Sequence, residues 1–368
     1  MDASLRMSLG RIIAQGLVPA TAALSPLDAV NNLAALQGQQ ASAIPWAIGV
    51  RCTGVSRARV EESFARGELV RSWPMRGTVH VTSARDHHWL RRLLRHRRAS
   101  WERQALSLGL TDALVERAAQ VACELLETSP LGVSRVALVE AWGSSGIDVV
   151  TASSAQDGLR RRHLIMRLHL DGVLTAGPVR AGEHLIVDAR SLPAAPGVSK
   201  GEPGHEEALA VLAARYAWGH GPIDAADLAR WTGLTLTEAR RALAGARVAG
   251  ESVGLPLAEC GGGLARADLA DLVEEYRVEA EAMHALPSFD ELHVGYKDRS
   301  CLTDEAGEAL ICPAKNGMFR PIVVEGGRVV AVRAPGREIV MVKGYESRRR
   351  PAARSFDDWE KWLSETQQ

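Results

Sequence analysis

The sequence has few lysines and no net charge. Only five of its 44 basic residues are Lys, and its formal net charge is zero. The molecule as a whole therefore does not attract a polyanion, and any binding to nucleic acid must come from local basic patches. The preference for Arg suits bidentate phosphate contacts, although a GC-rich genome would produce the same bias.

Paired cysteines and long apolar runs are also absent. The five cysteines lie singly and form no C-x-x-C pair, which argues against a disulfide framework or a zinc module. No stretch approaches the roughly 18 apolar residues of a membrane span, and the first residues have no long apolar core. We therefore expect a cytoplasmic protein that makes no contact with a membrane.

The 368 residues, 46% of them hydrophobic, are enough for two to four modules. Three segments repeat one order: a helix, a short helix, a longer amphipathic helix, and two short β-branched runs joined by a turn. That order is typical of the winged helix, a helix-turn-helix variant with a hairpin as its wing. The fold class we expect is α+β, with three tandem winged-helix modules and a C-terminal β-rich domain.

The module boundaries follow from composition. We predict winged helix 1 with a basic connecting helix at 1–110, winged helix 2 at 111–190, a Pro/Gly/Ser-rich linker at 191–204, winged helix 3 at 205–264 and a barrel-like α+β domain at 265–368.

Helices and strands are expected at definite places within these modules. The predicted helices are 56–66, 85–103, 112–126, a short one from 134, 155–171, 205–218, 225–231, 236–246, 266–285 and 355–364. The predicted strand pairs lie within 68–83, 173–189 and 247–258, the last as a small wing.

Two glutamines follow another predicted helix. Ser25 and Pro26 fit its N-cap and first turn, and Gly38 is its natural stop. Positions i and i+2 of a helix lie about 200° apart, so Gln37 and Gln39 could serve one cavity only if the helix ends between them. The alternative is a polar helix end that faces water.

A strand–turn–strand segment contains Trp73, Arg76 and His80, with Arg76-Gly77 as a tight turn. Its functional interpretation is an arm that contacts a nucleic-acid backbone and helps to line a pocket near Gln37. Its structural interpretation is a wing with a packed tryptophan and a solvated arginine. Both interpretations stay open on the sequence alone.

Two basic clusters are candidates for phosphate contact. The first lies on the predicted helix 85–103 and includes Arg91, Arg95 and Arg98, and the second includes Arg160 and Arg161. The alternative is a solvated helix face. Adjacent histidines at 87 and 88 point apart on a helix, so they predict no metal site.

The segment 287–299 mixes carboxylates with His293, Lys297 and Arg299. In isolation it suggests acid–base work by Asp290 or Glu291. The alternative at its end, where Asp298 stands next to Arg299, is a turn or an ion pair.

Three motifs together resemble the winged-helix DNA glycosylases of the AlkZ type, within the YcaQ-related superfamily. They are Q-x-Q at 37–39, SWPMRGTVH at 72–80 and LPSFDELHVGYKDRS at 286–300, and the resemblance spans essentially the whole chain. It implies that Gln37 and Gln39 are the catalytic pair and that 287–299 faces the DNA. The YcaQ-like branch has Asp at the second position, so Gln39 places this chain on the AlkZ side.

The resemblance also implies a substrate and a reaction. N7 alkylation gives a purine a positive charge and makes it a good leaving group, so two neutral amides that position water suffice for hydrolysis. No Lys lies beside the glutamines to form a Schiff base, so we predict no strand cleavage. We expect a monomer that binds duplex DNA with alkylated purines, including bulky adducts and interstrand crosslinks of the azinomycin type, without metal or cofactor, in DNA repair and genotoxin self-resistance.

Two other functions fit the same modules. Winged helices also occur in transcriptional regulators, and a regulator would recognise one sequence in undamaged DNA. A scaffold for protein contacts would show neither damage preference nor steep salt dependence of DNA binding.

Overall fold

The computed structural model describes residues 1–95, 99–147, 149, 154–193 and 197–365. The chain forms two compact units. The first comprises residues 1–60 and 206–368, and the second comprises residues 61–205. The first unit is thus discontinuous in sequence, with the second inserted after its first 60 residues. No helix in the described part of the chain is both long enough and apolar enough to cross a membrane.

A four-stranded antiparallel sheet in the order β11-β10-β9-β8 organises the first unit. Its strands are β8 (His284–Leu286), β9 (Ile322–Glu325), β10 (Arg328–Arg333) and β11 (Ile339–Met341). Successive side chains of a strand point to opposite faces. Ile322 and Val324 accordingly pack into one hydrophobic core, whereas Val323 packs into another. Both faces of the sheet are therefore buried.

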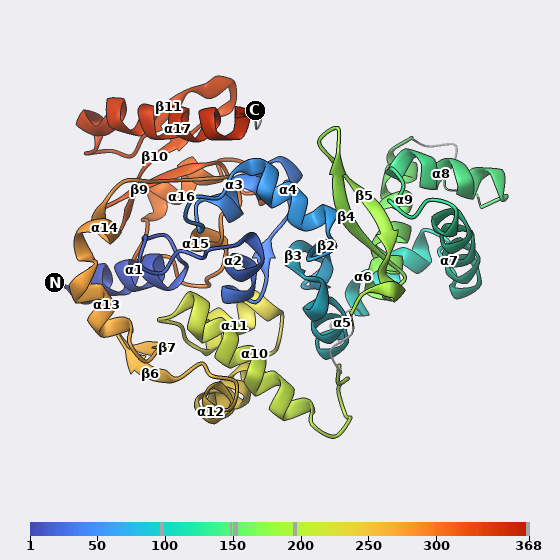
Figure 1. The fold of residues 1–368 in the computed structure, drawn as a ribbon, viewed down its shortest axis with the longest axis horizontal. Coiled ribbons are helices and arrows are strands. Elements are labelled where there is room, and N and C mark those ends of the chain that lie inside the picture. The colour runs from blue at the N-terminus through green and yellow to red at the C-terminus, as the bar shows by residue number, and fades with distance from the viewer. Residues whose placement is uncertain (96–98, 148, 150–153, 194–196, 366–368) are drawn as a thin grey trace. The chain divides into compact units, whose positions relative to one another are not determined.

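Different helices contribute to the two cores. Leu9, Ile12 and Ile13 of α1 (Ala3–Ala14) pack into the first core with residues of α13 (Leu269–Glu275). The second core contains Trp46 of α3 (Ile44–Gly49) and Phe356 of α17 (Arg349–Ser364). Figure 1 shows α17 in red beside β11. The C-terminal helix is therefore part of the core.

Several other elements of the first unit are short. They are α2 (Pro26–Asn32), β1 (Leu36–Gln37), α14 (Arg277–Glu281), α15 (Glu291–Val294), α16 (Glu305–Ile311) and the 3₁₀ turns η1 (Ala41–Ala43), η4 (Pro335–Arg337) and η5 (Glu346–Arg348). The helix α4 (Arg57–Ala65) leads from this unit into the second.

Three successive helices and a hairpin lie between residues 205 and 266. They are α10 (His205–His220), α11 (Ala225–Thr232), α12 (Leu236–Ser252), β6 (Leu257–Cys260) and β7 (Gly263–Arg266). The predicted caps are confirmed: Asp224 and Thr235 each form a reciprocal capping box with the acidic residue three positions on.

An antiparallel sheet in the order β3-β2-β4-β5 is the centre of the second unit. Its elements are β2 (Leu69–Met75), β3 (Thr78–Ser83), α5 (Ala84–Leu93), α6 (Ala99–Ser107), α7 (Asp112–Glu127), α8 (Arg135–Ser144), α9 (Ser154–Leu170), β4 (Leu174–Arg180), β5 (Glu183–Asp188) and the 3₁₀ turn η3 (Ala189–Ser191). Thr111 and Ser134 cap α7 and α8 as predicted. The strand–turn–strand predictions within 68–83 and 173–189 are confirmed.

Five element predictions are wrong in extent, and one of them is the C-terminal helix, which was predicted at 355–364 but begins at Arg349. The helix after Ser25 ends at Asn32, and Ala34 then adopts a left-handed backbone with φ 60°, so that Gln37 lies in a strand. The predicted helix 85–103 is two helices, α5 and α6. The helix after Thr235 runs to Ser252, and the strand pair predicted within 247–258 lies at 257–266 instead. The predicted helix 266–285 is α13, α14 and the strand β8, because its last residues pair with β9.

Candidate functional site

Gln37 lies in the two-residue strand β1 and is half-buried. Its side-chain Oε1 is buried and accepts no hydrogen bond from the residues that the structure describes. A buried acceptor without a protein partner needs an explanation, and a catalytic role or a bound water is one of those that apply. Gln39 follows two positions later and is also half-buried. As predicted, Gln37 and Gln39 do not both lie in one regular helix. The reason is that Gln37 lies in a strand, not that a helix ends between the two glutamines.

The backbone of Gln37 is held by Glu291. The N–H of Gln37 donates to Oε2 of Glu291 at 2.9 Å. Oε1 of the same carboxylate accepts from Nε1 of Trp231 at 2.7 Å and lies 3.2 Å from Nε2 of His220. Glu291 is only 1% exposed. A buried carboxylate with several donors is a fixed anchor, so Glu291 joins the Q-x-Q motif to α10, α11 and α15.

The neighbouring Asp290 holds a different part of the unit. Its two carboxylate oxygens accept from Nη1 and Nη2 of Arg51 at 2.9 and 2.8 Å. Oδ1 also accepts from the backbone N–H of Leu292, which caps α15. Burial lowers the pKa of Arg51, but Asp290 more than offsets this effect, so that the pKa is raised overall. Asp290 is thus a buried counter-ion.

A second buried ion pair lies below Tyr296. Nη2 of Arg11 is 3.0 Å from Oδ2 of Asp227, and both side chains are almost fully buried. The guanidinium of Arg11 also lies 3.8 Å from the ring centroid of Tyr296. Tyr296 donates to the carbonyl of His220 and accepts from Gln15. These contacts fix the chain after Glu291.

The other predicted binding residues of the segment 287–299 differ in accessibility. His293 is 2% exposed, and its Nε2 lies 2.9 Å from Oε1 of Glu308. The half-buried Arg299 pairs with the same carboxylate at 3.1 Å. Lys297 has an exposed side chain, and its backbone N–H donates to Asp227. Among these three, Lys297 offers the most accessible cation, whereas the burial of His293 fits a supporting contact rather than a contact with DNA.

Sequence reasoning missed the role of Glu291 as an anchor. The sequence marks it only as one carboxylate in a mixed segment, and its partners Trp231 and His220 lie 60 and 71 positions away. No local pattern could have connected them to Gln37. Arg51 was missed for the same reason.

The predicted hairpin of the second unit has the expected turn. Arg76 and Gly77 both have positive φ, 53° and 69°, as a two-residue type I′ turn requires. His80 is fully buried, with Nε2 3.3 Å from Nη2 of Arg76 and Nδ1 3.0 Å from the carbonyl of Thr78. Trp73 is 8% exposed and meets His169 edge-on at 4.7 Å. The hairpin tip with Arg76 is the accessible part of this segment.

The predicted basic clusters are only partly accessible. Arg91 is 9% exposed, and its Nη1 donates to the carbonyl of Leu170. Arg95 has a 41% exposed side chain and pairs with Asp171 at 3.1 Å. Arg160 and Arg161 are half-buried on α9. Arg98 lies outside the described residues. Arg91 therefore supports the fold. Phosphate contact by the other arginines of these clusters stays a prediction.

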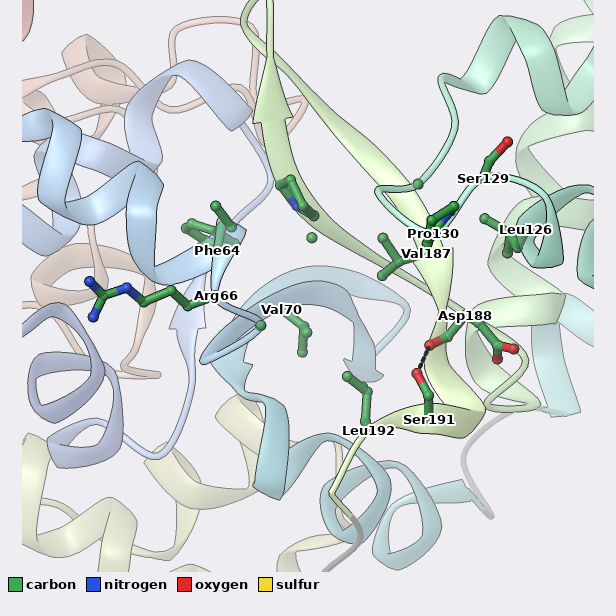
Figure 2. Close-up of a pocket in the computed structure, with 15 residues that line it drawn as sticks. Phe64, Arg66, Val70, Leu126, Ser129, Pro130, Val187, Asp188, Ser191 and Leu192 are labelled. Atoms are coloured by element: carbon green, nitrogen blue, oxygen red, sulfur yellow. Dashed lines mark hydrogen bonds between the residues drawn. The ribbon is translucent and has the colours of Figure 1, made fainter.

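A pocket of about 400 Å³ lies in the second unit (Figure 2). Its walls are mixed, with the apolar Phe64, Val70 and Leu126 beside polar residues such as Ser129 and Ser191. Asp188, at its edge, pairs with Arg190 at 2.7 Å. None of the predicted site residues lines it. Nor does any group of three metal-binding side chains occur among the described residues.

Comparisons with known proteins bear on the whole chain. Residues 30–342 match the sequence model of the family described as DNA glycosylase AlkZ-like. The fold is similar to that of the DNA glycosylase AlkZ of Streptomyces sahachiroi, with a TM-score of 0.66 and 22% sequence identity, over 96% of this chain and 97% of that one. No curated protein matches the sequence.

Proposed function

This chain belongs to the AlkZ-like family of DNA glycosylases, and we propose that it hydrolyses the N-glycosidic bond of N7-alkylated purines in duplex DNA. The substrates we propose include bulky adducts and interstrand crosslinks, whose release is the same C–N hydrolysis on a tethered base. The reaction would serve DNA repair and self-resistance to a genotoxin. The protein would act as a monomer without metal or cofactor.

Gln37 and Gln39 would carry the chemistry. The observation that supports this best is Oε1 of Gln37, a buried acceptor with no partner among the described residues. An amide oxygen of this kind can accept from a water and direct it to the anomeric carbon, while its dipole stabilises the positive charge that develops on the sugar. Both amides stay neutral at every relevant pH. An alkylated purine needs no strong acid to leave, so such a site favours damaged bases.

DNA binding would come from winged-helix modules. The order α10, α11, α12, β6, β7 in the first unit supports this proposal, and α7, α8, α9, β4, β5 in the second repeats it. The cations we propose for phosphate contact are the exposed Lys297, Arg95 with a 41% exposed side chain, and the half-buried Arg76, Arg160 and Arg161. Arg side chains at helix surfaces and hairpin tips suit this contact, which carries no sequence information by itself.

The test is release of 7-methylguanine from a duplex under single-turnover conditions. We expect release by the wild type and a loss of about 100-fold or more in the rate for Gln37→Ala and for Gln39→Ala. Gln120→Ala, an exposed glutamine on α7, is the matched control and should keep the wild-type rate. DNA affinity measured for all four proteins separates chemistry from binding.

Two outcomes would contradict the proposal. If the wild type releases no base but binds undamaged DNA tightly at one sequence, the protein is a regulator. If borohydride traps a covalent complex with DNA, the reaction proceeds through a Schiff base, and hydrolysis without strand cleavage is wrong.

A further inference from the structure

A groove in the first unit begins one residue after the Q-x-Q motif. It has a volume of about 500 Å³, and Gln40 is part of its lining. Three residues of chain span at most about 11 Å, so the Cα atoms of Gln37 and Gln40 lie no farther apart than that. The groove is thus next to the residues proposed to act on the deoxyribose.

Apolar side chains form much of the wall of this groove. Met318 is 60% exposed, and Phe319 lies beside it. The ring of Phe319 is fixed by edge-on contacts with Phe289 at 5.6 Å and with His293 at 5.2 Å. Three prolines add rigid surface: Pro313, Pro321 and Pro335. A polarizable thioether beside a fixed ring suits a flat apolar group, and the volume falls within the roughly 300–1,000 Å³ of small-molecule sites.

The polar groups of the groove are mostly engaged by the protein. Nη2 of Arg333 lies 2.7 Å from Oε1 of Glu360, and Arg337 pairs with the same carboxylate. Nη1 of Arg320 donates to the carbonyl of Leu310 at 3.2 Å. Arg333 already lies over the ring of Phe356, but the side chain of Arg337 is 70% exposed and offers a planar face on which an aromatic ring can stack. A phosphate would instead have to compete with Glu360 for two of the three arginines.

We propose that this groove receives the planar aromatic substituent of a bulky N7 adduct while the purine is at Gln37 and Gln39. This proposal rests on the proposed glycosylase function. It adds a subsite for the substituent that the lesion carries at N7. A methyl group at N7 is too small to fill the groove. The groove would therefore favour large aromatic adducts over small ones.

The test compares two duplexes of one sequence, one with N7-methylguanine and one with guanine that carries a naphthylmethyl group at N7. The measured quantity is the ratio of their kcat/KM values. We expect the wild type to favour the naphthylmethyl substrate, and Met318→Asp to lower the ratio about tenfold, because a charged carboxylate would have to be desolvated by the ring. Met318→Leu should keep the ratio.

Val278→Asp is the matched control, because Val278 is 79% exposed on α14 and does not line the groove. It should leave both rates unchanged. A second measurement is inhibition by the free bases: the naphthylmethyl base should inhibit more strongly than 7-methylguanine, and Met318→Asp should remove the difference.

The outcomes separate this proposal from the function on which it rests. If the wild type releases 7-methylguanine but Met318→Asp leaves the ratio of the two kcat/KM values unchanged, the groove is not a subsite for the adduct. The proposed glycosylase function would still stand. An equal loss for both substrates in Met318→Asp would also overturn the subsite. Failure of the wild type to release either base would overturn both.

Discussion

The backbone N–H of Gln37 donates to the buried carboxylate of Glu291, across 254 positions of sequence, at 2.9 Å. Because a main-chain group makes this contact, it fixes where the strand β1 runs and leaves the side-chain amide of Gln37 available. Asp290, the residue before Glu291, instead pairs with Arg51. Two adjacent buried carboxylates thus have separate tasks, one toward the Q-x-Q motif and one toward the core.

Because the two carboxylates have different partners, isosteric substitutions of Glu291 and Asp290 should affect different properties, the rate of base release and the thermal stability. Glu291→Gln replaces one acceptor oxygen by an amide donor and should shift β1 away from its position. Displacement of reacting groups by about 1 Å costs on the order of 100-fold in rate, so we expect kcat for base release to fall about 10- to 100-fold with little change in DNA affinity. Asp290→Asn keeps an acceptable helix cap and should lower thermal stability more than kcat. Equal losses of kcat in both variants would contradict this assignment.

Arg51 and Asp290 should account for a large stability effect. Arg51→Met leaves the carboxylate of Asp290 buried without its counter-ion, which typically costs about 3–5 kcal/mol. Arg348→Ala, which removes an exposed pair with Glu325, is the control and should cost less than about 1 kcal/mol. Urea unfolding of both variants measures the difference. A loss below about 1 kcal/mol in Arg51→Met would show that the pair does not stabilise the fold.

Local sequence signals predicted the elements whose ends they control. Asp224, Thr235, Thr111 and Ser134 each begin a helix where predicted, because a side-chain cap acts over three or four residues. The helix after Ser25 illustrates the limit. Ser25 caps this helix as predicted. Ala34, however, adopts a left-handed backbone conformation, which an alanine does not predict. Burial of Leu33, Ala34 and Leu36 in the tertiary structure outweighs helical propensity there.

The family could be predicted from the sequence, but the contacts that support the Q-x-Q motif could not. Three motifs identified the family, and the family match confirms that resemblance. The anchor could not be predicted, since Glu291, Trp231 and His220 meet Gln37 only after the chain folds. The same holds for the groove beside Gln40, whose lining comes from four separate segments. Contacts of long sequence separation leave no local pattern.

The hairpin tip allows a test of DNA contact that keeps the turn intact. Arg76→Asn removes the cation but tolerates the positive φ of this position. If Arg76 contacts a phosphate, the slope of log Kd against log salt concentration should decrease by about one. Arg117→Asn on α7, where the arginine is exposed, is the control and should keep the slope. A decrease in affinity at all salt concentrations without a change in slope would contradict a phosphate contact.

Gly77 should be required for the same turn. Its φ is 69°, and a Cβ there would meet nothing within 4 Å, so the cost of a substitution comes from the backbone alone. Gly77→Ala should destabilise the second unit by about 1 kcal/mol, as measured by local hydrogen exchange in β2 and β3. An unchanged exchange rate would show that the turn relaxes without cost.

Buried histidines should make the second unit sensitive to acid. Burial, with the nearby His88 and Arg91, lowers the pKa of His87 to about 3, and burial lowers the pKa of His184 to about 4. The unfolded chain takes up these protons near pH 6.5 and the folded chain does not, so the stability present at neutral pH is lost as pH falls from 6.5 toward 4. Each group contributes about 1.4 kcal/mol per pH unit in this window.

His87→Leu tests this account, because neither ring nitrogen of His87 has a hydrogen-bond partner among the described residues. An apolar side chain therefore leaves no broken hydrogen bond at this position. The unfolding free energy of the His87→Leu variant is measured by hydrogen exchange of the second unit between pH 7.5 and 4.5. It should depend on pH less steeply than that of the wild type, because unfolding of the variant takes up about one proton fewer. Parallel curves for the two proteins would show that His87 is protonated in the folded state and that burial does not suppress its charge.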